Sequence, residues 1–133
     1  MRHPRLKPDC HDTWHHCYNR AVGFQSDRPF STADKEQFVR ILHRVAQFYT
    51  VHIVGYQFMS NHFHIVALVP VAQPGQLETI RRFEEFHDGK RTLKPGSAAC
   101  RAWQERLRDI SWCMRHLQHL CTAWYNRTRS ERR

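Results

Sequence analysis

The stretch TVHIVGYQFMSNHFHIVALVP, Thr50 to Pro70, decides the fold of this chain. It contains two runs of β-forming residues separated by Ser60–Asn61, a pair that favours a turn. A connection this short predicts that the two runs pair as an antiparallel hairpin. Side chains alternate in direction along a strand, so His62 and His64 share one face and the apolar residues between and after them lie on the other. The stretch therefore predicts a sheet with one core-facing side and two histidines on the opposite side.

Helical periodicity surrounds this hairpin. Ser31 can cap a helix, and the spacing of the apolar residues after it predicts an amphipathic helix from Thr32 to Tyr49. WHHCYNRAV, Trp14 to Val22, is expected to form an earlier strand. After the hairpin we expect a short helix from Leu77 to His87 and one long helix from about Ala99 to Asn126. This order of elements predicts a single α+β domain with helices packed on an antiparallel sheet.

Composition narrows the class of protein. The chain has 133 residues, of which 41% are hydrophobic, which is sufficient for one core. Its formal net charge of +9 comes mainly from arginine and indicates a polyanionic partner, the alternative being a basic surface that only aids solubility. Five cysteines in irregular spacing, no leading apolar segment and no membrane-spanning run predict a cytoplasmic protein, near the nucleoid if bacterial. Residues 1–13 are expected to form a flexible basic arm.

The two histidines have a chemical interpretation and a structural one. Two imidazoles side by side on a rigid strand can hold one divalent ion, which then needs further ligands. Oxygen ligands would suit Mg²⁺ or Mn²⁺, and cysteine ligands would suit Zn²⁺. The alternative is that His62 and His64 are half-exposed residues on a sheet surface with no ligand.

The residues around the pair resemble a known family. YQFMSNHFHIVALVP is similar to the strand of the HUH single-tyrosine transposases, especially the REP-associated type and its insertion-sequence relatives, in which Met, Asn and two histidines precede an apolar run. WHHCYNRAV resembles the family's first strand, where a histidine (His16) precedes an arginine (Arg20) by four residues. MRHLQHLCTAWYNRTR resembles the helix that ends in an aromatic-Asn-Arg sequence. The resemblance covers most of the chain, and residues 71–99 look like an insertion.

This resemblance implies a ferredoxin-like or RRM-like sheet with helices on one face and a long C-terminal helix. It implies that His62 and His64 bind Mg²⁺ or Mn²⁺, and that hairpin-bearing single-stranded DNA is cut through a phosphotyrosine intermediate. A homodimer is expected by analogy with the family. We expect DNA contacts from basic residues of the first strand and the last helix: His16, Arg20, Arg115, Arg127 and Arg129.

One part of the family pattern does not occur in this sequence. The catalytic tyrosine of the family stands in a sequence such as Tyr-Ile-x-x-Asn-Pro or Tyr-Ile-x-x-Gln, and neither is found here. Either the chain is a fragment without its catalytic helix, or one of its four tyrosines is the nucleophile. Tyr125 is then the best candidate, since it follows His64 and lies beside Arg127 and Arg129. The alternative function is a DNA-binding module derived from such a transposase that cuts nothing.

A second group of metal-ligand residue types lies near the N-terminus. DCHDTWHHCYNR contains five such side chains within eight residues: Cys10, His11, His15, His16 and Cys17. Zinc modules usually place two ligand pairs well apart in the sequence. A strand here would also direct His16 away from His15 and Cys17, so we expect polar surface and core residues more than a zinc site.

Overall fold

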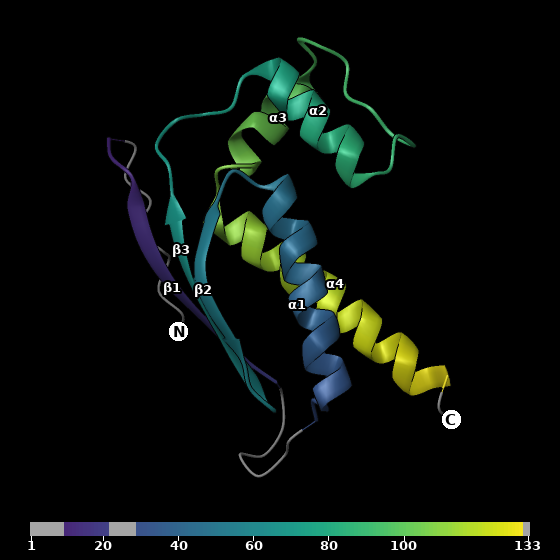
Figure 1. The fold of residues 1–133 in the computed structure, drawn as a ribbon. Helices are drawn as coiled ribbons and strands as arrows, with labels where there is room; N and C mark the ends of the chain where they lie inside the picture. Colours follow the sequence, from purple (N-terminus) through teal and green to yellow (C-terminus); the bar gives the residue numbers. More distant parts are fainter. Residues whose placement is uncertain (1–9, 22–28, 132–133) are drawn as a thin grey trace.

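The computed structural model describes residues 10–21 and 29–131 (Figure 1). Most of the expected N-terminal arm, residues 1–9, lies outside this range, as does Val22 at the end of the expected first strand. The described elements, in chain order, are β1 (Thr13–Arg20), α1 (Thr32–Phe48), β2 (His52–Phe58), β3 (His62–Val69), α2 (Gln76–Phe86), α3 (Ala98–Arg106) and α4 (Ile110–Glu131).

The three strands form one antiparallel sheet in the order β1-β3-β2, so the strand that carries the two histidines is central. The predicted hairpin of β2 and β3 is confirmed, with Phe58 opposite Phe63 next to the turn. Helices α1 and α4 lie on the same side of the sheet (Figure 1). Their buried residues form one core with Cys17, Ile65 and the other apolar side chains on the facing side of the strands. The chain is therefore an α+β protein whose sheet has one covered face and one open face.

The helix expected from Ala99 to Asn126 is two helices, α3 and α4, and the single-helix prediction is wrong there. The side chain of Asp109 accepts hydrogen bonds from the backbone N–H groups of Ser111 (2.8 Å) and Trp112 (3.3 Å), which starts a new helix. The carbonyl of Leu107 accepts hydrogen bonds from the backbone N–H (2.7 Å) and hydroxyl (3.0 Å) of Thr50. Both sides of the break are thus stabilised by bonds that a continuous helix would not make.

Helix α1 begins with a capping box. The hydroxyl of Ser31 accepts from the backbone N–H of Asp34 (3.1 Å), and the carboxylate of Asp34 accepts from the backbone N–H of Ser31 (2.8 Å). Asp34 is fully buried and also pairs with the guanidinium of Arg129 at 2.6 Å. This pair ties the first turn of α1 to the last turns of α4.

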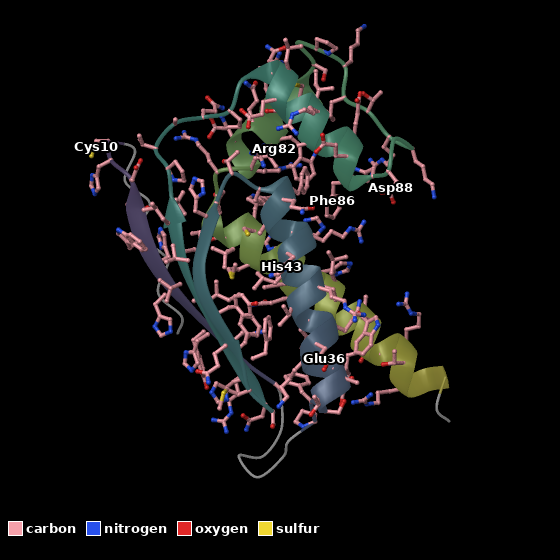
Figure 2. The ribbon with its side chains drawn as sticks, in the orientation of Figure 1. Cys10, Glu36, His43, Arg82, Phe86 and Asp88 are labelled. Carbon is pink, nitrogen blue, oxygen red and sulfur yellow. The ribbon has the colours of Figure 1, made fainter. Side chains whose placement is uncertain are left out.

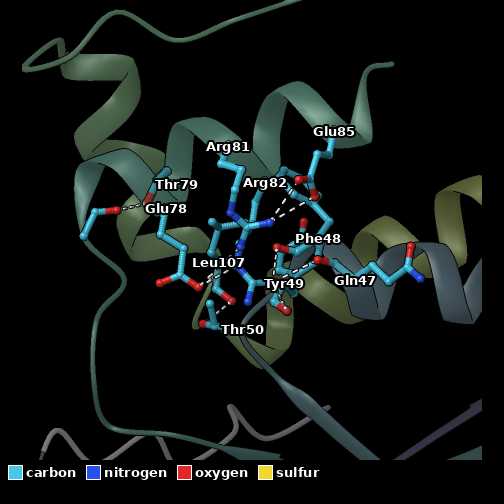
Figure 3. Close-up of polar contacts among 11 residues, drawn as sticks. Gln47, Phe48, Tyr49, Thr50, Glu78, Thr79, Arg81, Arg82, Glu85 and Leu107 are labelled. Carbon is cyan, nitrogen blue, oxygen red and sulfur yellow. Dashed lines mark hydrogen bonds and ion pairs between the residues drawn. The ribbon is translucent and has the colours of Figure 1, made fainter. Parts of the chain in front are cut away.

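The segment 71–99, which resembles an insertion, contains α2 and packs against the helical side of the molecule. Figure 2 shows Arg82 and Phe86 of α2 where this helix meets α1. The ring of Phe86 stacks on Phe48 with centroids 4.6 Å apart. The guanidinium of Arg82 donates to the carbonyls of Gln47 (2.9 Å), Phe48 (3.3 Å) and Tyr49 (3.3 Å), at the C-terminus of α1 (Figure 3). A cation at this position satisfies the last carbonyls of the helix and interacts favourably with its dipole.

Replacing Arg82 with alanine should lower the free energy of unfolding by about 1–2 kcal/mol, because these carbonyls lose a charged donor. Arg81 is a matched control: it pairs with Glu85 on the same helix, but its side chain is 54% exposed and Arg81→Ala should cost about 0.5 kcal/mol or less. Urea unfolding of both variants measures the difference. Equal losses would show that Arg82 adds no more than an ordinary surface ion pair.

Candidate functional site on the open face of the sheet

The open face of the sheet carries aromatic residues, histidines and few charges. Within the three described strands no residue is acidic, and Arg20 is the only arginine or lysine. Solvent-facing sheets usually alternate core residues with polar and charged ones, so this composition is unusual for a surface that only meets water. The side chains on this face of β1 and β3 are Trp14, His16, Tyr18, Arg20, His62, His64, Val66 and Leu68.

Strand register brings the predicted histidines together with residues from β1. Tyr18 lies opposite His64, and Arg20 lies opposite His62. Nε2 of His16 is 3.0 Å from Nδ1 of His64, and the two rings stack with centroids 5.1 Å apart. His62 and His64 have ring centroids 5.1 Å apart and nearly perpendicular planes. We call His16, His62 and His64 the histidine cluster.

Each of the two β3 histidines makes a polar contact through Nδ1. The Nδ1 atom of His62 is 2.7 Å from Oδ1 of Asn61, and Nδ1 of His64 is the atom that contacts His16. An amide oxygen only accepts hydrogen bonds, so this contact requires a proton on Nδ1 of His62, and the tautomer with that single proton has its lone pair on Nε2. If His16 accepts in the same way, both β3 rings present Nε2 lone pairs. This is how metal-binding histidines are usually held by a neighbouring acceptor.

The described part of the chain does not supply a complete metal site. Within residues 10–21 and 29–131, no three His, Cys, Asp or Glu side chains are grouped so that they could hold a metal ion. An ion on His62 and His64 would therefore take its other ligands from water, from phosphate oxygens or from groups outside the described residues.

The four tyrosines lie in different environments. Tyr49 is buried, which raises the pKa of its phenol, and its hydroxyl is 3.0 Å from Nδ1 of His116. Tyr56 lies opposite the buried Ile65, on the covered side of β2, where its ring meets His43 of α1. Tyr18 is the tyrosine in contact with the histidine cluster: its ring centroid is 5.5 Å from that of His62 and 5.1 Å from that of His64.

The structure does not bring Tyr125 to the two histidines. Tyr125 is on α4, on the covered side of the sheet, and its hydroxyl donates to the carbonyl of Pro29 at 3.4 Å. Its ring packs against Phe30 and under the guanidinium of Arg129, 4.1 Å from the ring centroid. The sheet thus separates Tyr125 from His62 and His64. The contacts of its ring with Phe30 and Arg129 indicate a packing role for Tyr125.

The predicted DNA-contacting residues fall into two groups. His16 and Arg20 are exposed on the open face. Arg115 and Arg127 are exposed on α4, on the helical side, and the guanidinium of Arg115 lies 5.2 Å from the ring centroid of Trp112. Arg129 is already engaged with the carboxylate of Asp34 and the carbonyl of Pro29. Its charge is therefore compensated within the protein.

The N-terminal group of possible zinc ligands is divided by β1, as the alternation of a strand predicts. Cys17 is buried in the core, His15 contacts Thr13 at 3.1 Å, and His16 points to the open face. In the core, burial raises the pKa of the Cys113 and Cys121 thiols to about 12. These two thiols stay protonated at neutral pH, which suits apolar packing and not metal binding or nucleophilic attack.

His116 belongs to a second group of histidines, in the helical layer. Its pKa is lowered, first by burial and then by the charges of His119, Arg44 and His87 around it. A neutral imidazole in this position packs against Phe48 and Phe86. We attribute its environment to packing between α1, α2 and α4.

Sequence reasoning missed Trp14 and Tyr18 as members of the open face. The sequence signal that could have found them is the period of two in Trp14, His16, Tyr18 and Arg20, which alternate with inward residues such as Cys17.

The helices that the structure describes include none long and apolar enough to cross a membrane. Comparison of the chain with family models, curated proteins and solved structures finds no match.

Proposed function

We propose that this chain is a metal-dependent DNA-processing domain of the HUH type, which binds hairpin-bearing single-stranded DNA and a Mg²⁺ or Mn²⁺ ion on its open face. The observation that carries the proposal is the position of His62 and His64, side by side on the central strand of a rigid sheet. The strand order β1-β3-β2, with α1 and α4 on one side of the sheet, supports a ferredoxin-like arrangement. In this arrangement β1, α1, β2, β3 and α4 correspond to the first five elements of that fold.

The residues of the cluster have separate tasks in this proposal. His62 and His64 bind the ion through Nε2, while Asn61 and His16 hold their Nδ1 atoms and so fix the orientation of the rings. The ion would polarise the scissile phosphodiester and stabilise the charge that develops on it. Arg20, opposite His62 at the end of β1, would bind an adjacent phosphate of the same DNA strand.

Binding of Mn²⁺ should depend on the cluster in a graded way. His62→Ala or His64→Ala should weaken Mn²⁺ binding by about 100-fold or more, because each removes a ligand, and His16→Ala should weaken it by about tenfold, because it removes only a support. His52→Ala is the matched control, since His52 is also exposed on this sheet but lies opposite Leu68, away from the cluster. Calorimetric titration of the four variants tests this order. Unchanged affinity in the His62 and His64 variants would refute the metal site.

A second candidate function is a DNA-binding module that cuts nothing. The observation that favours it is that Tyr125 lies on the covered side of the sheet, where its hydroxyl donates to Pro29, whereas His62 and His64 lie on the open face. Incubation with hairpin-bearing single-stranded DNA and Mn²⁺, followed by denaturing electrophoresis, separates the two functions. A covalent adduct that is lost in Tyr125→Phe or Tyr18→Phe would establish cleavage and identify the nucleophile. DNA binding without any adduct would establish the module.

A further inference from the structure

Strand β1 presents two large aromatic side chains to solvent. Trp14 is 63% exposed and Tyr18 is 46% exposed, although both belong to a regular strand that is paired with β3. Aromatic surface of this size gains free energy when another flat apolar surface covers it. Their exposure therefore points to a ligand with flat rings.

The spacing of these rings suits consecutive unpaired bases. Trp14, His16 and Tyr18 are alternate residues of β1, so one ring follows another at about 6.6 Å along the strand. Sheet aromatics at such positions stack two or three bases of an extended single strand. A duplex keeps its bases stacked on one another and cannot offer their faces to a sheet.

Charge distinguishes a nucleic acid from a second copy of this chain as the occupant. The three strands contain no carboxylate, and Arg20 lies at the end of the same row of residues. Two identical faces in a symmetric dimer would bring arginine and histidine toward their own copies with no acidic partner on either sheet. A polyanion with flat bases complements both the charge and the aromatic rings.

We propose that Trp14 and Tyr18 form a stacking platform for unpaired bases of single-stranded DNA that runs along β1. This inference rests on the proposed function and adds the register of the substrate. The ring of Tyr18 touches both His62 and His64, so the base stacked on Tyr18 sets which phosphate of the strand meets the histidine cluster. Trp14, four residues away, holds a base farther from the cluster.

The test measures binding of a fluorescent oligo-dT by anisotropy, without metal, at low salt. Trp14→Ala and Tyr18→Ala should each weaken binding about tenfold, whereas Tyr18→Phe should bind as the wild type because it keeps the ring. Leu77→Ala is the matched control, since Leu77 is an exposed apolar residue (81%) on α2. The affinity for duplex DNA should be the same in all variants. In a parallel titration with oligo-rU, Trp14→Ala and Tyr18→Ala should weaken binding no more than they weaken binding of oligo-dT.

The outcomes separate this inference from the proposed function. If the wild type binds oligo-dT but the two alanine variants bind it equally well, the platform is refuted and the proposed function stands. If the wild type binds no single-stranded DNA, both fail. A dimer that dissociates in Trp14→Ala, with unchanged DNA binding, would assign the face to self-association instead. Circular dichroism of each variant should give the wild-type spectrum, because the substituted side chains are exposed.

Discussion

Replacing Asp34 with alanine should lower the free energy of unfolding by about 2 kcal/mol. The carboxylate is fully buried, accepts from the backbone N–H of Ser31 at 2.8 Å and pairs with Arg129 at 2.6 Å. Loss of the hydrogen bond that the Asp34 carboxylate contributes to the capping box accounts for about 1 kcal/mol, and loss of the ion pair with Arg129 for about as much. Urea unfolding at neutral pH measures the effect.

Glu36 provides the matched control for this substitution. It is an exposed carboxylate at the start of the same helix, labelled in Figure 2. Glu36→Ala should change the free energy of unfolding by about 0.5 kcal/mol or less. A loss at Asp34 no larger than that at Glu36 would show that the link between α1 and α4 does not stabilise the fold.

The same pair predicts how stability depends on pH. Burial alone would raise the pKa of Asp34, but hydrogen bonds from Arg129 and Ser31 outweigh it and hold the pKa below its ordinary value of 3.8. The folded state therefore binds this proton less readily than the unfolded state. The contribution of Asp34 is present above pH 3.8 and is lost as the pH falls through the lowered pKa. The difference in stability between wild type and Asp34→Ala should shrink over that interval.

Affinity for single-stranded DNA should fall about 50-fold between 50 and 200 mM salt. Neutralising about four phosphates of a single strand gives a slope of roughly −3 in a plot of log affinity against log salt, because the counterions are released on binding. Anisotropy titrations at several salt concentrations measure this slope. A flat dependence would count against nucleic acid as the partner of this chain.

Individual arginines should change the slope according to their surroundings. Arg20→Gln should make it shallower by about 0.7, because Arg20 is exposed on the open face and would contact one phosphate. Arg129→Gln is expected to leave the slope unchanged, since Arg129 is held by Asp34 and Pro29. Arg115→Gln and Arg127→Gln test whether DNA also reaches the helical side. If the salt slope changes in Arg115→Gln or Arg127→Gln but not in Arg20→Gln, the DNA binds on α4.

The local features of this fold follow from the sequence alone. The short turn at Ser60–Asn61 leaves an antiparallel hairpin as the simplest pairing, and alternation along His62 to Val69 assigns the histidines to one face and Phe63 to the other. Helix α1 was predicted almost to the residue, because its cap and its apolar period are both local signals.

Only the tertiary structure decided which distant residues meet. Asp109 caps the start of α4 locally, but the carbonyl of Leu107 on the other side of the break is bound by Thr50, 57 positions away in the sequence. Arg129 was predicted to contact DNA, but its main partner, Asp34, lies 95 positions earlier and is brought beside it by helix packing. Tyr18 joins the histidine cluster because β1 pairs with β3 in a register that no local pattern specifies. Short-range periodicity thus determined the elements and their faces, whereas the partners of the side chains depended on contacts that form only when the whole core is packed.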